Sequence, residues 1–282
     1  MDVVVNLSCP DRPGIVARVS QLLLQRGANI IESQQFNDPR NDVFFMRIVC
    51  SIPPDGPTEA TLHEDFNALV PALDMTFQIR RTDAPVRMLV MVSSSGHCLN
   101  DLLFRWRTGA INADIPVIVS NHLDLEPLAA AYQVPFVHIP VTAATKAEAE
   151  AALRVVLADY QIDLVVLARY MQVLSDDLAG DFPGRIINIH HSFLPSFKGA
   201  KPYHQAFARG VKLIGATAHY VTADLDEGPI IEQDVIRVDH RMSAVDLVRS
   251  GQECESRVLA RAVTWHCQSR VILNLDRTVV FS

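Results

Sequence analysis

Cysteine pairs, long apolar runs and an excess of positive charge are all missing from this chain of 282 residues. The five cysteines are scattered and include no C-x-x-C pair: Cys9, Cys50, Cys98, Cys254 and Cys267. That spacing argues against a disulfide framework or a structural zinc site. No apolar run approaches the roughly 20 residues that span a bilayer, and the start at Met1 lacks the basic segment of a signal peptide. We therefore expect a cytoplasmic protein with reduced thiols.

The charge of the chain bears on which ligands it can bind. The net charge of −7 argues against general nucleic-acid binding, which needs an electropositive face. Locally the balance reverses, because residues 183–223 contain no acidic residue. The same stretch holds five basic residues: Arg185, Lys198, Lys201, Arg209 and Lys212. This pattern favours a small anionic ligand, although a solvated basic face would look the same.

The first 80 residues predict a small α+β domain. A hydrophobic content of 49% in a chain of this length allows one or two buried cores. Apolar alternation and helical spacing predict strands at 2–8, 28–37, 43–50 and 75–80, with helices at 15–26 and 58–73. The order β-α-β-β-α-β is that of a ferredoxin-like sandwich. We therefore assign residues 1–80 to a first domain.

Two turns in this region resemble those of ACT domains, which bind small amino acids. They are the D-R-P-G turn from Asp11 to Gly14 and the G-A-N-I start of the second strand at Asn29. The resemblance implies that Asp11, Gly14 and Asn29 face an amino-acid effector at a domain interface, and that the chain forms a homo-oligomer. The alternative is that Gly14 and Asn29 only serve backbone turns, where both residue types are common.

The remainder of the chain predicts a second fold. Residues 81–87 are polar with one proline and suit a linker, so we assign 88–282 to a second domain. Strands are expected at 88–92, 116–120, 136–139 and 163–168, separated by helical segments such as 99–107 and 146–160. This alternation predicts a doubly wound, mostly parallel Rossmann-like sheet. An amphipathic helix over 243–265, with Ser243 as its N-cap, and a terminal strand over 272–281 complete the prediction.

Most polar residues suited to chemistry lie between Arg185 and Val238. Side chains alternate along a strand, so Asn188 and His190 point one way and His191 the other. Asp226 follows a second strand-like run over 215–221. An amide donor, an imidazole and a carboxylate at strand ends suit attack on a carbonyl group. Taken singly, each is also typical of a core or turn position.

The pattern N-I-H-x-S-x-L-P followed by a D-x-G-P-I turn resembles the folate-dependent formyltransferase family. The resemblance implies that Asn188, His190 and Asp226 are catalytic. It also implies that the segment after the fourth strand holds the pteridine ring of the substrate, and that a second loop contacts the same ligand. The substrate-binding residues expected on this basis are Met171, Gln172, Val173, Leu174, Thr222 and Asp224.

The loop at residues 93–97 bears on which acceptor takes the formyl group. Glycinamide ribonucleotide formyltransferase carries an S-G-x-G-S-N loop for its substrate phosphate, whereas this chain has a single glycine in the loop 93–97. The resemblance is therefore strongest to the members that hydrolyse 10-formyltetrahydrofolate to formate and tetrahydrofolate, with no metal and no prosthetic group. Asn188 and His190 would stabilise the oxyanion, and Asp226 would orient or deprotonate the water.

Three alternatives stay open. The first is transfer of the formyl group to an amine such as glycinamide ribonucleotide, which would use the same residues. The second is a metal-dependent hydrolase, which we disfavour because adjacent strand histidines should diverge and no H-x-x-x-H pattern is present. Its candidate ligands are His190, His191, His204, His219 and Asp226. The third is an amino-acid-sensing protein whose second domain is inactive.

Overall fold

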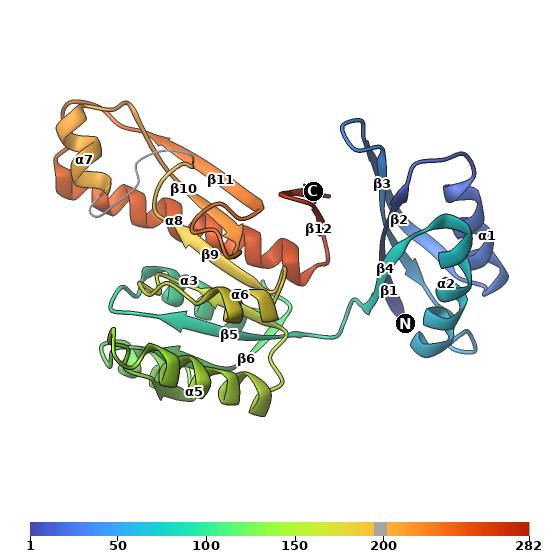
Figure 1. Cartoon of the computed structure of the whole chain (residues 1–282), viewed down its shortest axis with the longest axis horizontal. Coiled ribbons are helices and arrows are strands. Elements are labelled where there is room, and N and C mark those ends of the chain that lie inside the picture. The colour runs from blue at the N-terminus through green and yellow to red at the C-terminus, as the bar shows by residue number, and fades with distance from the viewer. Residues whose placement is uncertain (195–201, 282) are drawn as a thin grey trace. The chain divides into compact units, whose positions relative to one another are not determined.

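The computed structural model describes residues 1–194 and 202–281, which form two compact units (Figure 1). The first unit comprises Met1–Pro85 with Gln268–Asn274 and residues 279–281, and the second comprises Val86–Cys267 with Leu275–Thr278. No helix among the described residues is long and apolar enough to cross a membrane. The five cysteines are buried and carry reduced thiols.

The first unit is the predicted ferredoxin-like sandwich. Its elements are β1 (Asp2–Pro10), α1 (Ile15–Gln25), β2 (Asn29–Asp38), β3 (Val43–Ser51), α2 (Glu59–Leu73) and β4 (Thr76–Arg81). The strands form an antiparallel sheet in the order β2-β3-β1-β4. Alternate residues of β1, among them Val5 and Leu7, pack with Val19 of α1 and Phe66 of α2 in one core. Alternate residues of β1 and the helically spaced residues of α1 thus pack in the same core.

The end of the chain also belongs to this first unit. The buried Arg47 of β3 donates to the carbonyl oxygens of Ser269, at 3.1 Å, and Gln268, at 3.2 Å, and forms an ion pair with Glu32 at 2.8 Å. Asn6 also donates to the carbonyl of Ser269. Residues 268–274 therefore pack with the first unit, whereas the sequence placed them in the segment 88–282. The boundaries at 80 and 88 stay a prediction.

The single terminal strand expected over 272–281 was wrong. Two short strands replace it, β12 (Val271–Asn274) and β13 (Arg277–Val280). Between them Leu275 has a φ of 56°, in the left-handed region, which interrupts an extended run. Because β-branched residues stand on both sides of this turn, the sequence pattern alone gives no sign of it.

The second unit is the predicted doubly wound sheet. Its elements are β5 (Val86–Val92), α3 (His97–Arg107), β6 (Ala113–Ser120), α4 (Glu126–Ala131), β7 (Phe136–His138), α5 (Lys146–Asp159), β8 (Leu164–Leu167), α6 (Asp176–Asp181), β9 (Ile186–His190), α7 (Pro202–Arg209), β10 (Leu213–Tyr220), β11 (Ile230–Arg237) and α8 (Ala244–Cys267). The strand order is β11-β10-β9-β8-β5-β6-β7. Strands β9 to β7 are parallel, and β10 and β11 are antiparallel additions. The order reverses direction between β5 and β8, and ligands bind at the carboxyl ends of strands beside such a switch point.

Helix α8 runs along β9, β10 and β11 of this sheet and also packs on α3 (Figure 1). Its start is capped as expected, because Ser243 Oγ accepts a hydrogen bond from the backbone nitrogen of Asp246 and the Asp246 carboxylate accepts from Ser243. On its inner face, Gly251 lies against Tyr203 of α7. A Cβ atom at position 251 would lie 2.1 Å from Cζ of that ring, so only glycine leaves room for it.

We expect Gly251→Ala to destabilise the protein by about 1–3 kcal/mol, because the added methyl group must displace a buried aromatic ring. Chemical denaturation measures this difference. Gly180→Ala is the matched control, since a Cβ there meets no atom within 4 Å and also lies in a helix. Equal stability of the two variants would contradict the packing described for Tyr203.

Candidate active site

A cleft of about 300 Å³ opens at the carboxyl ends of β8 and β9. The three predicted catalytic residues, Asn188, His190 and Asp226, all line it. So do all the residues predicted to bind substrate: Met171, Gln172, Val173, Leu174, Thr222 and Asp224. The fold thus brings the predicted residues of three separate segments together around one space. That space is within the size range of small-molecule sites.

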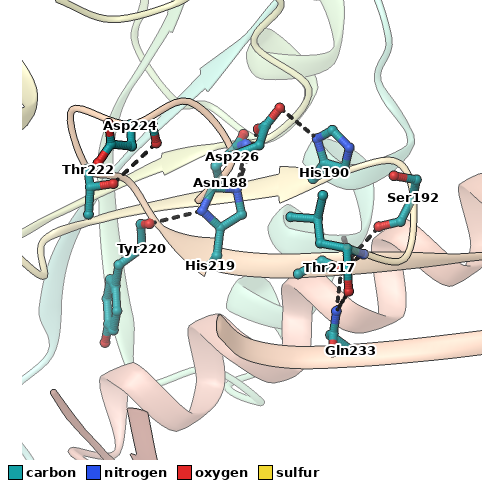
Figure 2. Close-up of polar contacts among 11 residues, drawn as sticks. Asn188, His190, Ser192, Thr217, His219, Tyr220, Thr222, Asp224, Asp226 and Gln233 are labelled. Carbon is teal, nitrogen blue, oxygen red and sulfur yellow. Dashed lines mark hydrogen bonds and ion pairs between the residues drawn. The ribbon is translucent and has the colours of Figure 1, made fainter. Parts of the chain in front are cut away.

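The register of β9 sets the positions of Asn188 and His190. β9 runs parallel to β8, with Asn188 opposite Leu167, and antiparallel to β10, with Asn188 opposite His219 and His190 opposite Thr217. Directly opposed residues on neighbouring strands point to the same face of a sheet. Figure 2 shows the consequence, with Asn188 and His219 in contact and His190 further along the same strand.

Thr217 holds the chain that follows His190. Its buried hydroxyl donates to the carbonyl of Ser192, at 3.0 Å, and accepts from the backbone nitrogen of Leu194, at 3.1 Å (Figure 2). Gln233 of β11 donates to the same oxygen at 2.9 Å. The loop leaving β9 is therefore bonded to its neighbouring strands, which restrains the backbone of His190.

Asp226 reaches the cleft from the loop between β10 and β11. Its φ is 58°, and two residues later a Cβ at Gly228 would lie 1.8 Å from the carbonyl oxygen of Tyr220. Only glycine permits that close approach of two backbone segments. The loop closes with a 2.9 Å hydrogen bond from the Tyr220 nitrogen to the Pro229 carbonyl. The glycine of the D-x-G-P pattern is therefore needed for the loop to fold back toward β9.

The carboxylate of Asp226 lies between two imidazoles. Its Oδ2 is 3.2 Å from Nδ1 of His190, and its Oδ1 is 3.7 Å from Nε2 of His219 (Figure 2). Hydrogen bonding to His190 and then the proximity of the His219 ring hold the pKa of Asp226 well below its usual range, although burial opposes this. Asp226 is therefore an anion at neutral pH.

The second ring nitrogen of His190 makes no hydrogen bond to any residue that the structure describes. Nδ1 of the ring faces Asp226, and the unpartnered nitrogen is Nε2, which is buried. Buried polar atoms in proteins are nearly always paired. An orphaned imidazole nitrogen beside an anionic carboxylate is therefore a candidate contact for a reacting group.

His219 is a site residue that sequence reasoning considered only as a metal ligand. Its Nδ1 donates to the carbonyl of Tyr220 at 2.9 Å, so in the neutral ring Nε2 carries a lone pair. That lone pair accepts from Nδ2 of Asn188 at 3.2 Å. His219 thereby fixes which way the Asn188 amide is turned and leaves its second N–H available. The alternation of side chains along the run 215–221 would have identified His219 as a site residue, once the pairing of that run with β9 was known.

The expected divergence of His190 and His191 was wrong. Their rings stack, with centroids 5.0 Å apart and an interplanar angle of 26°. Strand β9 ends at His190, so the alternation of side chains no longer applies to the next residue. Burial lowers the pKa of His191 to about 4, and the positive charges of Arg169 and His190 add to this effect. His191 is accordingly neutral near pH 7.

Metal-ligating side chains converge elsewhere in the described residues. His97, Cys98 and Glu255 place their ligand atoms within 4.8 Å of one another. Burial raises the pKa of the Cys98 thiol, which keeps it protonated, and Nε2 of His97 already lies 2.8 Å from Glu255. A buried hydrogen-bonded pair accounts for this cluster. Among the histidines of the metal alternative, His204 lies on α7, while His190 and His219 contact Asp226.

The predicted effector residues are not brought together within one chain. Asp11 and Gly14 follow the end of β1, and Gly14 caps α1 with a φ of 94°. Asn29 pairs with Ser51, which also pairs with Asp2, so it lies level with the start of β1 on the far side of β3. The Asp11 carboxylate instead accepts a 2.5 Å hydrogen bond from Asn37. Because β1 and β2 run in the same direction, Asp11 after the end of β1 and Asn29 at the start of β2 lie at opposite ends of the sheet.

Comparison with known proteins agrees with this geometry. A formyl transferase family model matches residues 86–263, and an ACT domain model matches residues 3–67. The chain is 48% identical to formyltetrahydrofolate deformylase of Synechocystis over 98% of this chain and 97% of the relative. It is 47% identical to the Bacillus subtilis protein of the same name, over 98% of this chain and 92% of that one. The chain belongs to the formyltetrahydrofolate deformylase family.

Solved structures show how far this family likeness extends. The formyltetrahydrofolate deformylase of Burkholderia mallei superposes with a TM-score of 0.95 at 50% identity, covering 100% of this chain and 99% of that one. Glycinamide ribonucleotide transformylase 1 of Symbiobacterium toebii gives a TM-score of 0.66 at 34% identity, covering 73% of this chain and 97% of that one. The full-length match is therefore to deformylases, and the transformylase matches only part of the chain.

We expect Asp226→Asn to alter how stability depends on pH. Because the folded-state pKa of Asp226 is lowered, its ionised form stabilises the fold above the ordinary aspartate pKa of about 3.9. This contribution is lost as the pH falls through the folded-state value. The stability advantage of the wild type over Asp226→Asn should shrink as the pH falls below about 4. Thermal unfolding of both proteins across the acid range measures it, and a constant difference would contradict the pairing.

Proposed function

We propose that this chain hydrolyses the N10-formyl group of 10-formyltetrahydrofolate to formate and tetrahydrofolate, with Asn188, His190 and Asp226 as its catalytic residues. The observation that carries the proposal is the convergence of these three side chains in one cleft, with an anionic carboxylate against one imidazole nitrogen and the other nitrogen unpartnered. The names of relatives that match the chain over nearly its whole length support the same reaction.

In the proposed mechanism, water attacks the formyl carbon and produces a tetrahedral oxyanion. Asn188 donates its second amide N–H to that oxygen, since the first is held by His219. His190 donates from Nε2 while Asp226 accepts from its Nδ1 and stabilises the positive ring. The C–N bond then breaks, and the proton lost by the water reaches the leaving nitrogen of the folate.

Asp226 has two roles in this scheme. Oδ2 holds His190, and Oδ1 lies 3.7 Å from His219, too far for a hydrogen bond. Oδ1 is therefore available to accept a hydrogen bond from the attacking water, which orients the water or removes its proton. A carboxylate that is fully ionised at neutral pH suits this step.

The substrate ring is proposed to bind between residues 171–174 and the loop 222–226. Met171, Val173 and Leu225 expose more than half of their side-chain surface at the cleft, at 57%, 55% and 62%. Exposed apolar side chains gathered at one cleft are typical of a binding surface. They would cover the faces of a bicyclic ring, while the backbone of the two segments meets its polar edges.

Transfer of the formyl group to an amine is the second candidate, because the catalytic residues serve both reactions. The loop between β5 and α3 favours hydrolysis. It contains one glycine, and its last residues are engaged inside the protein, with Ser95 bonded to His97 and His97 to Glu255. Such a loop is poorly suited to surround a phosphate group with backbone N–H groups.

We propose a reaction without a metal ion, an amino-acid effector on the ACT unit, and a homo-oligomer acting in the cytoplasm. The exposed apolar residues Ile30, Ile31 and Phe36 on the edge strand β2 support pairing with another copy. Chelator treatment should leave the rate unchanged, amino acids should alter it, and light scattering should give a mass above 31.3 kDa.

We expect His190→Ala and Asp226→Asn to lower kcat strongly, and Asn188→Ala to lower kcat by about 10²–10³-fold with little change in folate affinity, because its donor acts on the transition state. Formate release from 10-formyltetrahydrofolate is the measurement. Asp55→Asn, in an exposed turn of the first unit, is the control. Near-normal formate release by His190→Ala or Asp226→Asn would refute the assignment.

A second experiment separates hydrolysis from transfer. Purified protein is supplied with 10-formyltetrahydrofolate in plain buffer, with and without glycinamide ribonucleotide. Hydrolysis predicts formate at the same rate in both samples and no formylated amine. Formylated product that appears at the expense of formate would favour the transfer reaction.

A further inference from the structure

Arg169 lies at the reaction centre but has no role in the mechanism above. β8 and β9 are parallel neighbours, and Leu167 pairs with Asn188. Arg169 and His190 are each two residues beyond that pair, on strand ends that lie about 5 Å apart in a sheet. Both residues line the same cleft. A permanently charged guanidinium is thus adjacent to the proposed catalytic imidazole.

The backbone at Arg169 turns its side chain away from the direction that the strand would give it. Its φ is 67°, in the left-handed region, which side-chain-bearing residues seldom adopt. The side chain is directed toward α8, where Nε lies 3.4 Å from the carboxylate of Glu255. Backbone strain of this kind persists only where the surroundings hold the residue firmly.

Glu255 provides that restraint. It is only 1% exposed, and its carboxylate is bonded by Nε2 of His97, at 2.8 Å, and the hydroxyl of Tyr203, at 2.5 Å. Burial alone would raise the pKa of Glu255, but bonding to His97, the charge of Arg169 and bonding to Tyr203 together lower it. A buried carboxylate that is ionised needs these partners. Glu255 is therefore a fixed anion that orients the guanidinium from behind.

Arg169 also lines the cleft, and its side chain is 18% exposed. Among the residues that the structure describes, its buried Nε makes no hydrogen bond, and its one ion pair, with Glu255, spans 3.4 Å. The positive charge of Arg169 also contributes to lowering the pKa of His191, whose ring stacks on His190. Arg169, His191 and His190 therefore adjoin one another at the edge of the reaction centre.

We propose that Arg169 binds the formate ion that the reaction releases, and that Glu255 is its positioning residue. This inference rests on the proposed function. During hydrolysis a C–O bond to the water oxygen forms, the C–N bond breaks, and one proton goes to the leaving nitrogen. The formic acid so formed loses a second proton to solvent. The formyl group is neutral in the substrate, and the oxyanion formed from it is a single charged oxygen held by Asn188 and His190. A carboxylate with two charged oxygens exists only after the C–N bond has broken.

The position of Arg169 favours formate over the glutamate carboxylates of a folate. The formyl carbon must lie at Asn188, His190 and Asp226, and a benzoyl ring separates it from the glutamate tail. Arg169 adjoins His190 itself, so an anion on Arg169 lies where the formyl carbon is released. A planar guanidinium also matches the two oxygens of a carboxylate.

Inhibition by added formate tests this directly. Formate should inhibit the wild-type enzyme reversibly, and Arg169→Gln should weaken that inhibition by about tenfold or more, the usual effect of removing a charge-assisted hydrogen bond. Ionic strength is held constant with chloride. Arg249→Gln, at an exposed position on the same helix as Glu255, is the matched control. Formate should inhibit this variant as strongly as it inhibits the wild type.

Glu255→Gln tests the positioning role. It keeps the shape of the side chain but removes the fixed charge, so formate inhibition should weaken in the same direction while Arg169 remains present. If that variant does not fold, Tyr203→Phe removes a single hydrogen bond from Glu255 and should produce a smaller shift of the same sign. Binding of isotope-labelled formate followed by NMR gives the same comparison without turnover.

The outcomes are distinct. Absence of formate release by the wild type would refute the proposed function. Normal formate release with no inhibition by formate, or with inhibition unchanged in Arg169→Gln, would refute only the role of Arg169. A large rise in KM for the folate in Arg169→Gln with unchanged formate inhibition would assign the guanidinium to a tail carboxylate instead, and would equally overturn the inference.

Discussion

The contact between Asp226 and His190 is the interaction on which the rest of the site depends. It joins a loop to a strand, and neither segment alone places its side chain usefully. The strand supplies His190 through the register of β9, and the loop reaches it only because Gly228 passes against the Tyr220 carbonyl. The low pKa of Asp226 follows from this contact and makes the carboxylate an anion under all physiological conditions.

A second anion, Glu255, organises the opposite side of the reaction centre. Like Asp226 it is ionised and is bonded to an imidazole, but it is far more buried, at 1% exposure. Asp226 faces the cleft, and Glu255 faces the protein interior and acts through Arg169. The two carboxylates thus lie in different environments, because Asp226 lines the cleft and Glu255 is enclosed by α3, α7 and α8.

The first unit depends on the end of the chain as well as its beginning. Arg47 and Asn6 bind the backbone of residues that directly follow α8, and Asn274 donates to Asp38. These are buried polar groups that need partners, and residues 268–274 supply them. Because α8 also carries Glu255, one continuous stretch of chain serves the reaction centre of the second unit and the sheet of the first.

The amino-acid sequence by itself determined both folds, the order of their elements, and the identity of the trio Asn188, His190 and Asp226 as a group. It could do so because periodicity and turn chemistry are local, and because the N-I-H and D-x-G-P patterns each occupy a few consecutive residues. Only the tertiary structure decided that His219 turns the Asn188 amide, that the His191 ring stacks on His190, that Asn37 rather than Asn29 meets Asp11, and that Arg169 meets Glu255. Each of these contacts joins residues from different elements, or follows the point where a strand ends. Cross-strand register and the return paths of loops are set by packing of the whole unit, and periodicity along one segment carries no information about them.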